Sequence, residues 1–248
     1  MGIICKERKS TYTIDMPPRK RSRKKTEKKS KQQMLFHQIF FNIGKGELKE
    51  IPRFYECYQN NKKKCKAQGI TYKLWTRKMV EKLLEKKENK IFKRIYYEKE
   101  QDIMRIDFAR YLILYRYGGI YVDLDICMIG KSIKHLFQKD YFFVRWHDSH
   151  LPYNAILGTQ KNNPLYRDIL DHCIESYDEK KKNKIYKTWK GRFVFQTTGH
   201  FMLQRVLKKH KIKGYLDILR ILAKDGRIVQ GSDPLFEDTS ASVWFDKK

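Results

Sequence analysis

The sequence predicts an α/β protein in which helices pack against a mostly parallel central sheet. Two observations lead to this prediction. Strand-like and helix-like segments alternate along the chain, and no internal repeat interrupts the alternation. In addition, 41% of the 248 residues are apolar and 14% are aromatic. This content is enough to bury a sizeable core and excludes a largely disordered chain.

The first half of the chain contains the clearest elements. The apolar segment at 34–41 predicts a buried strand, and Thr76 is a suitable N-cap for a helix. Residues 100–117 carry apolar side chains at helical spacing, and Gly118 and Gly119 stop this helix. The other elements of this half are predicted as a helix at 51–68, a strand at 70–75, a helix at 76–87 and a short apolar stretch at 91–97.

The second half alternates in the same way. An apolar strand is predicted at 120–126, directly after the paired glycines. Further strands are predicted at 141–146, 155–158 and 193–197, and helices at 164–177 and 200–209. No linker divides this part of the chain, so one domain is expected over residues 32–248.

Residues 1–31 differ from the rest because twelve of them are basic and three are acidic. The densest run, at 17–25, has no apolar side chain around which to fold, so a disordered basic arm is predicted. Such an arm suits a nuclear-localisation-like signal, a peripheral contact with an anionic membrane, or a solubilising tail. The sequence leaves these three roles open.

The whole chain has a formal net charge of +27, which suggests a polyanionic partner. Most lysines, however, lie in mixed runs such as 85–88, which are typical of solvated helix faces. The charge alone therefore does not favour nucleic acid as the main partner. A nucleic-acid-binding protein that uses the arm together with aromatic side chains stays an alternative.

Neither a membrane span nor a secretory signal is expected from the sequence. No apolar run approaches the roughly 18 residues that a membrane helix needs, and the first ten residues lack an apolar core. The cysteines are odd in number and form no CxxC, which argues against a disulfide framework or a zinc site. They are Cys5, Cys57, Cys65, Cys127 and Cys173. A cytoplasmic location, or one peripheral to a membrane, is expected.

An acidic pair is the most informative feature of the sequence. Asp123 and Asp125 are two residues apart in an apolar context, so both would point to one face of a regular strand. Two neighbouring carboxylates repel each other and favour a bound divalent cation. Their hard oxygen ligands suit Mg²⁺ or Mn²⁺. The carboxyl end of a strand is also where open α/β sheets bind ligands.

A second pair precedes the first. Asp107 and Arg110 are three residues apart on the predicted helix and hence share a face. Facing one site, the carboxylate would hold sugar hydroxyls and the guanidinium a diphosphate. Taken singly, each feature also has an ordinary structural explanation, such as a surface ion pair or a helix stop.

Together these residues resemble a known family. The segment from Arg110 through Gly118 and Gly119 to Asp125 looks like the signature of the DXD sugar-binding glycosyltransferases. These are glycosyltransferase family 32, with the Golgi α-mannosyltransferases, and more distantly the glucosylating bacterial toxins. Weaker matches follow in the correct order and extend the resemblance over residues 34–245. They are the segments 35–40, 72–76 and 154–158, the pair Thr198 and Gly199, and the segment 242–244.

The resemblance implies a GT-A fold and a metal-dependent, retaining transfer of a hexose. The donor would be GDP-mannose or a UDP-sugar, and the acceptor a glycan, a lipid or a protein. Asp125 would bind Mn²⁺ or Mg²⁺ directly, and Asp123 would contact the ribose and a metal-bound water. Asp107 would hold sugar hydroxyls, and Arg110 would reach the sugar and the diphosphate. The resemblance further places Tyr121, Ser242 and Trp244 at the donor, the last two on a segment that closes over the diphosphate.

The sequence departs from the family in two places. A histidine is often found shortly before the Ser-x-Trp and helps to bind the metal. Here an acid such as Glu237 or Asp238 would serve instead, or the metal site would be weaker. His200 stands where the family has proline after Thr-Gly, and it is either a helix-capping residue or part of the acceptor side. No catalytic nucleophile is assigned.

An enzyme of another class also stays open. Haloacid-dehalogenase-like phosphatases carry an Asp-x-Asp at the end of an apolar strand. Cys127, however, stands where that class has Thr or Val, and a long folded segment precedes the acidic pair.

Overall fold

The computed structural model describes residues 33–44, 46–98, 101–146, 151–182, 190–222 and 228–238. The expected basic arm, Ser242 and Trp244 lie outside these residues, and the domain boundary after residue 31 stays a prediction. No helix in the described ranges combines the length and the apolar character that crossing a membrane requires.

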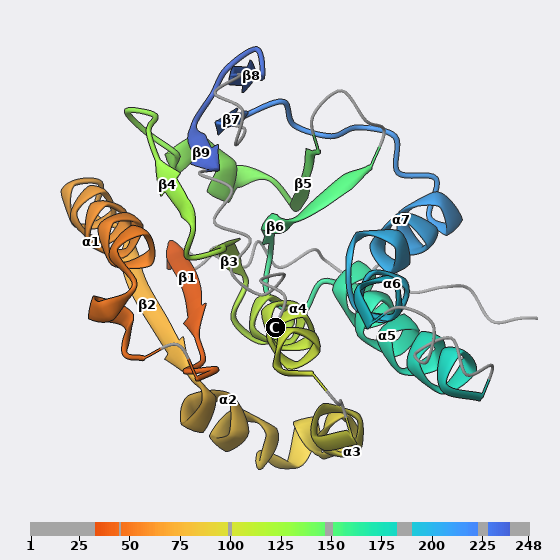
Figure 1. Ribbon diagram of the computed structural model, residues 1–248. Coiled ribbons are helices and arrows are strands. Elements are labelled where there is room, and N and C mark those ends of the chain that lie inside the picture. The colour runs from red at the N-terminus through yellow and green to blue at the C-terminus, as the bar shows by residue number, and fades with distance from the viewer. Residues whose placement is uncertain are drawn as a thin grey trace, which may run out of the picture. The chain divides into compact units, whose positions relative to one another are not determined.

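A five-stranded sheet with the order β2-β1-β3-β6-β5 forms the centre of the fold (Figure 1). Strand β1 pairs in parallel with both β2 and β3, whereas β6 runs antiparallel to β3 and to β5. Four strands therefore share one direction, which confirms the mostly parallel sheet. The strands are β1 Leu35–Phe40, β2 Thr71–Thr76, β3 Gly119–Val122, β5 Tyr141–Arg145 and β6 Pro152–Thr159.

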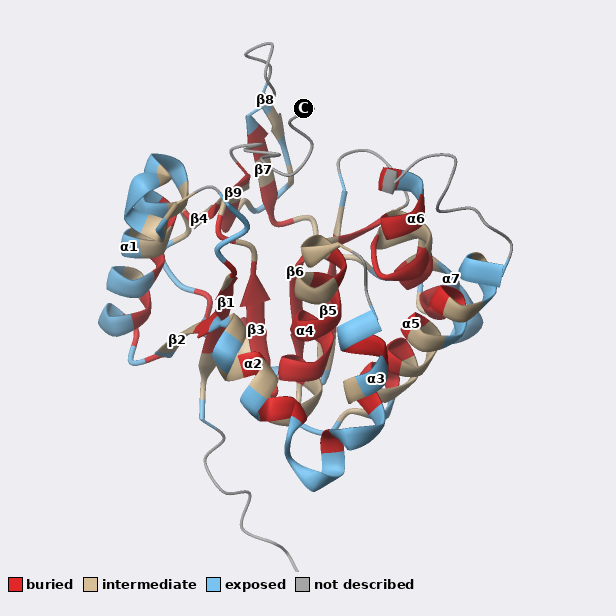
Figure 2. Ribbon diagram, turned by 60° about the horizontal axis from the view of Figure 1, so that its bottom comes forward, coloured by how far each residue is buried: buried red, intermediate tan, exposed pale blue. Residues whose placement is uncertain are grey.

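Helices cover this sheet, and the described residues bury both of its faces (Figure 2). Along β3, Tyr121 packs into one core, while Ile120 and Val122 pack into the other. The first core also takes side chains from the helices α2 Arg77–Leu84, α3 Lys90–Glu98, α4 Asp102–Tyr117, α5 Pro164–Lys182, α6 Lys190–Thr197 and α7 His200–Lys209. The second core receives α1 Pro52–Ala67. Short 3₁₀ turns lie at Leu48–Glu50, Lys87–Asn89 and Lys134–Gln138.

A second, four-stranded sheet has the order β4-β9-β7-β8. Its strands are β4 Ile126–Met128, β7 Leu219–Leu222, β8 Ile228–Gln230 and β9 Phe236–Asp238. The prediction of one strand at 120–126 is therefore wrong in its second half. The chain leaves the central sheet after Val122, turns through residues 123–125, and enters the second sheet at Ile126. The acidic pair lies in this turn.

The prediction of a strand at 193–197 is also wrong, because these residues belong to α6. The aromatic run Phe193-Val194-Phe195 looks strand-like, but Phe193, Val194 and Thr197 bury one face of a helix. The apolar stretch at 91–97 likewise forms helix α3. By contrast, Thr76 accepts a hydrogen bond from the backbone N–H of Met79, which confirms it as the N-cap of α2.

Side chains of α1 bind the backbone of β4. The Asn61 side chain donates to the carbonyl of Ile126 and accepts from the N–H of Met128, at 2.8 and 2.7 Å. Asn60 donates to the carbonyl of Met128, and Lys64 reaches the carbonyl of Ile129. Helix α1 thus occupies the edge of β4 that β9 leaves unpaired.

A disulfide between Cys57 and Cys127 joins α1 and β4 covalently. The expectation that the cysteines form no disulfide is therefore wrong for this pair. Spacing could not reveal it, because the two cysteines are 70 residues apart and meet only when α1 packs against β4. Cys65 is a buried free thiol, Cys173 is also buried, and Cys5 lies outside the described residues.

His37, on β1, is a fully buried imidazole. Its Nδ1 lies 3.1 Å from the indole N–H of Trp75, and its Nε2 lies 3.0 Å from the carbonyl of Gly118. Because an indole N–H only donates and a carbonyl only accepts, the ring is neutral, with its proton on Nε2. Burial lowers the pKa of His37 to about 4, although the bond to Gly118 opposes this effect.

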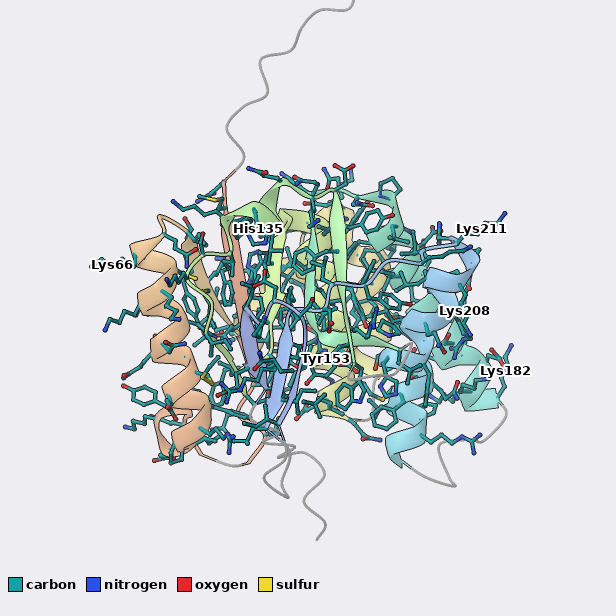
Figure 3. All side chains as sticks on the ribbon, turned by 90° about the horizontal axis from the view of Figure 1, so that it is seen from above. Lys66, His135, Tyr153, Lys182, Lys208 and Lys211 are labelled. Atoms are coloured by element: carbon teal, nitrogen blue, oxygen red, sulfur yellow. A yellow bond between two sulfur atoms is a disulfide. The ribbon has the colours of Figure 1, made fainter. Side chains whose placement is uncertain are left out.

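We expect His37 to make the protein less stable in acid. Below pH 6.5 the unfolded histidine takes up a proton, whereas the folded one stays neutral until about pH 4. The contribution of His37 to the free energy of unfolding should therefore fall by about 3 kcal/mol across this interval, and the difference between wild type and variant isolates it. Urea unfolding at a series of pH values measures the fall, and His37→Gln should remove it. The same substitution at His135, which lies at the surface (Figure 3), should preserve it. Identical pH profiles for wild type and His37→Gln would contradict the assignment.

Candidate active site

The turn that carries the acidic pair is fixed by the central sheet. The N–H of Asp123 donates to the carbonyl of Ala155 on β6, and its carbonyl accepts from the side chain of Gln38 on β1. Both distances are 2.9 Å. The Asp123 side chain remains 26% exposed, so a ligand can reach it. The site therefore lies at the carboxyl ends of β1 and β3, as expected for an open α/β sheet.

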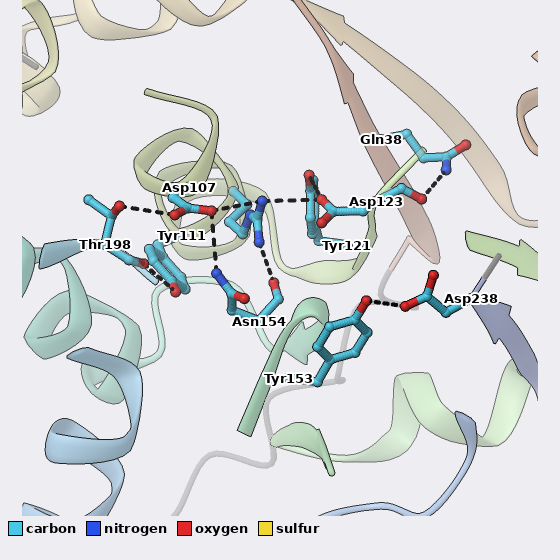
Figure 4. Close-up of polar contacts among 10 residues, drawn as sticks. Gln38, Asp107, Tyr111, Tyr121, Asp123, Tyr153, Asn154, Thr198 and Asp238 are labelled. Atoms are coloured by element: carbon cyan, nitrogen blue, oxygen red, sulfur yellow. Dashed lines mark hydrogen bonds and ion pairs between the residues drawn. The ribbon is translucent and has the colours of Figure 1, made fainter. Parts of the chain in front are cut away.

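Arg110, on helix α4, links Asp107 to Asp123 of this turn, and Figure 4 labels both aspartates. One terminal nitrogen lies 2.9 Å from the Asp107 carboxylate and 3.2 Å from that of Asp123. The other donates to the carbonyl of Asn154 on β6, at 2.7 Å. The side chain is only 2% exposed, so this is a buried cluster and not a surface ion pair. Burial alone would lower the pKa of Arg110, but Asp123, and also Tyr121 and Asp107, raise it above its ordinary value.

Asp107 joins three elements of the fold. Its carboxylate accepts from Arg110, from the side-chain amide of Asn154 at 3.3 Å and from the hydroxyl of Thr198 at 2.9 Å. Tyr111 in turn donates to the carbonyl of Thr198. Asp107 is only 3% exposed. Its contacts hold together α4, β6 and the residue that follows α6. Asn154 and Thr198 belong to segments that the sequence resemblance marked, but the resemblance gave them no role.

Two tyrosines hold the acidic side chains. Tyr121 donates its hydroxyl to Asp123, and its ring faces the guanidinium of Arg110 with the centre 5.0 Å away. Tyr153, at the start of β6, donates to Asp238 at the end of β9. The structure places Tyr121, named from the sequence, in the wall of the cavity beside Asp123. Sequence reasoning missed Tyr153, which looks like an ordinary strand aromatic.

The structure decides between the two acids near the C-terminal part of the described chain. Asp238 lines the same cavity as Asp123 and Asp125 and is 4% exposed. Glu237 instead forms an ion pair with Arg220, at 3.2 Å. Adjacent residues of a strand point to opposite sides, so only one of the two reaches the site.

Three aspartates, Asp123, Asp125 and Asp238, line one cavity, and their repulsion favours a divalent cation. Burial raises the pKa of Asp125, and the charges of Asp123 and Asp238 raise it further. Burial also raises the pKa of Asp123, although Arg110 and Tyr121 oppose this. A hard cation would relieve the repulsion, and carboxylate oxygens are the ligands it prefers. In the described part of the chain, no group of three or more Asp, Glu, His or Cys side chains is placed so that it could hold a metal ion. Mg²⁺ commonly keeps water or phosphate oxygens as further ligands beside one or two carboxylates.

Two cavities meet at the turn. The larger, of about 430 Å³, is lined by Asp107, Asn154 and Asp238 together with aromatic side chains. The smaller, of about 110 Å³, is mainly apolar and is lined by Ile39, Phe40, Phe41, Ile43, Ile51, Phe54, Ile103, Ile106 and Leu124. Arg110, Asp123 and Asp125 line both cavities. A ligand with one apolar and one polar end could therefore span them past the acidic pair.

His200 is the first residue of α7, and its ring lies against Phe195 and Phe201, with centres 4.6 and 4.3 Å apart. Gly199, not His200, is the N-cap residue, and no side chain caps this helix. The capping role considered from the sequence is therefore wrong. His200 lines the larger cavity, and burial lowers its pKa.

The fold is of the GT-A type, in which a mostly parallel sheet carries an acidic pair at its ligand-binding edge. Residues 46–143 match the family described as "Glycosyltransferase sugar-binding region containing DXD motif". Residues 46–143 are thus similar to a DXD sugar-binding region, which confirms the resemblance found in the sequence.

Comparison with known proteins gives further similarities. The chain is 31% identical over 96 residues to "Inositol phosphoceramide mannosyltransferase 1" of Schizosaccharomyces pombe, covering 33% of this chain and 30% of that protein. It is 23% identical over 144 residues to an uncharacterized glycosyltransferase of Acanthamoeba polyphaga mimivirus, covering 56% and 55% of the two chains. The chain therefore spans between about a third and about half of these curated relatives.

A solved structure supports the fold. The "PaToxG Glycosyltransferase" superimposes with a TM-score of 0.51 at 16% sequence identity, over 72% of this chain and 70% of that one. At this level of identity the likeness concerns the fold alone, and it confirms the GT-A prediction.

Proposed function

We propose that this protein is a metal-dependent glycosyltransferase that moves a hexose from a nucleotide-sugar donor to an acceptor with retention of configuration. The observation that carries the proposal is the meeting of the two cavities at Asp123 and Asp125, next to the buried pair of Asp107 and Arg110. This arrangement offers separate surroundings for a base, a diphosphate and a sugar along one path. The resemblance and the DXD sugar-binding region support the same activity.

The smaller cavity suits the nucleobase. Phe40, Phe41 and Phe54 line it and offer flat apolar surfaces for an aromatic ring. Phe40 stands where the family has tryptophan at the end of its opening strand. From this cavity the ribose and the diphosphate would pass Asp123 and Asp125, and the sugar would enter the larger cavity. The donor is a UDP-sugar or GDP-mannose.

Asp125 would hold Mn²⁺ or Mg²⁺ directly, with Asp123 acting through a water and Asp238 as a further carboxylate. Such an ion would supply positive charge against the negative charge that develops on the leaving diphosphate. Arg110 contributes positive charge at the same place, and its three protein partners fix its position before the donor arrives. Asp107 holds Arg110 and presents its carboxylate to sugar hydroxyls at the cavity wall. Ser242 and Trp244 are proposed to close over the diphosphate.

The acceptor is a glycan, a glycolipid or a protein. One relative is named as a mannosyltransferase of inositol phosphoceramide, and a glycolipid is one of the three acceptor classes proposed for this chain. Peripheral contact of the basic arm with an anionic membrane would fit such an acceptor.

A panel of nucleotide sugars tests the proposed function. The purified protein is incubated with UDP-glucose, UDP-galactose, UDP-N-acetylglucosamine or GDP-mannose and Mn²⁺, and release of the nucleoside diphosphate is measured. We expect turnover of one donor, loss of turnover in EDTA and recovery with added Mn²⁺. NMR of the first product should show the anomeric configuration of the donor. Phosphatase turnover without any dependence on the sugar nucleotide would refute the proposal.

A further inference from the structure

The larger cavity has an aromatic part as well as an acidic one. Besides the aspartates, its lining includes Trp146 at the end of β5, Phe195 on α6 and His200 at the start of α7. These three rings come from separate elements, and the donor path described above uses none of them. We propose, building on the proposed function, that they form an acceptor subsite for an uncharged saccharide.

Trp146 is the first observation that supports the subsite. Trp146 is 39% exposed. Its large aromatic ring therefore offers an apolar surface that a ligand can cover. The ring packs edge-on against Tyr153, with centres 4.4 Å apart, and this contact fixes its orientation. Tyr153 also donates a hydrogen bond to Asp238. The same tyrosine therefore positions both the Trp146 ring and the Asp238 carboxylate.

Phe195 and His200 are the second observation. Both rings are half-buried and lie against each other, and His200 also contacts Phe201. The lowered pKa of His200 keeps its imidazole neutral at physiological pH, so it can both donate and accept a hydrogen bond. One face of a hexose carries C–H groups and its rim carries hydroxyls. Aromatic faces suit the C–H groups, and a neutral imidazole suits a hydroxyl.

The charge of the cavity decides the class of saccharide. Among the described residues that line it, four are aspartates and one, Arg110, is a permanent cation. Arg110 is engaged by Asp107, Asp123 and Asn154. No lysine is found in this described lining, although the chain has a net charge of +27. An acceptor that carries phosphate, sulfate or carboxylate would meet repulsion here, whereas a neutral sugar would not.

The experiment compares neutral and anionic acceptors in the full-length protein. Methyl α-mannoside, methyl β-glucoside and lactose are the neutral probes, and myo-inositol 1-phosphate is the anionic one. Binding is measured by saturation-transfer difference NMR in the presence of diamagnetic Mg²⁺ and either UDP or GDP, which requires no turnover. Transfer from the active donor is then measured with the same acceptors. The binding arm therefore tests the subsite even if no donor in the first panel is turned over.

We expect at least one neutral saccharide to bind, with no competition from inositol phosphate. Trp146→Ala should weaken its binding at least about tenfold and raise the acceptor KM to match. Trp146→Phe, which keeps an aromatic face, should restore much of the affinity. Tyr97→Ala, which removes an exposed aromatic from α3, is the matched control and should change neither quantity.

Two results would overturn the inference. One is an affinity for neutral saccharides that Trp146→Ala leaves unchanged. The other is tighter binding of inositol phosphate than of every neutral probe. If Trp146→Ala does not fold, two other variants test the subsite. His200→Ala should lose affinity for the neutral saccharide, and Trp146→Phe should retain it.

Discussion

Replacing Asp125 with asparagine is expected to lower sugar transfer by at least about 100-fold while the fold stays intact. The substitution removes the carboxylate that we assign to direct metal binding but keeps the size of the side chain. Donor turnover and Mn²⁺ binding, followed by calorimetry, measure the two losses. An activity close to that of the wild type would remove Asp125 from the proposed metal site.

Thermal unfolding of the same variant separates a catalytic loss from misfolding. Burial and the charges of Asp123 and Asp238 raise the pKa of Asp125, so its ionised form destabilises the metal-free protein at neutral pH. Asparagine relieves this cost, and each 1 kcal/mol gained would raise the Tm in EDTA by about 2–4 °C. Mn²⁺ should stabilise the wild type more than the variant. Asp171→Asn, which alters a partly exposed ion pair with Arg167, is the control and should leave activity unchanged.

The second large effect concerns the Cys57–Cys127 disulfide. Removing it in the double variant Cys57→Ser, Cys127→Ser is expected to lower the free energy of unfolding by about 4 kcal/mol. The reason is the sequence separation of 70 residues, because the bridge restricts a long loop in the unfolded chain. Urea unfolding of oxidised wild type and of the variant measures the difference.

Reductant provides the matched control for the disulfide. Dithiothreitol should bring the wild type to the stability of the double variant and should leave the double variant unaffected. The native contact of α1 with β4 should persist, because Asn60, Asn61 and Lys64 still bind the β4 backbone. If oxidised and reduced wild type unfold at the same urea concentration, the bridge does not form in solution.

Much of the fold was predictable where elements are long and periodic. The helix preceding Gly118 and the strands at 34–41 and 70–75 follow from local patterns, which need no knowledge of their partners. The break inside 120–126 does not. The chain is continuously apolar there apart from Asp123 and Asp125, and only the pairing of β4 with β9 shows that it changes sheets. Strands β7, β8 and β9 were missed because they are short and their pairing is non-local.

The site was predictable in part, through the residues that belong to a motif. The structure brings Asp107, Arg110, Tyr121, Asp123 and Asp125 together at two adjoining cavities. Tyr153 was missed because β6 runs against its neighbours, so the start of this strand reaches the ligand-binding edge. The choice between Glu237 and Asp238 required the register of β9, and no sequence pattern contains that information. The roles of the assigned residues stay predictions until the variants are measured.

The contact between α1 and β4 also has a consequence for self-association. Strand β4 is an outer strand of its sheet, and such strands normally present a row of free N–H and C=O groups that can pair with a strand of another molecule. Here Asn60 and Asn61 already bind these groups at Ile126 and Met128. The helix therefore shields this edge from intermolecular strand addition, which protects the protein against aggregation at the place where its acidic turn enters the second sheet.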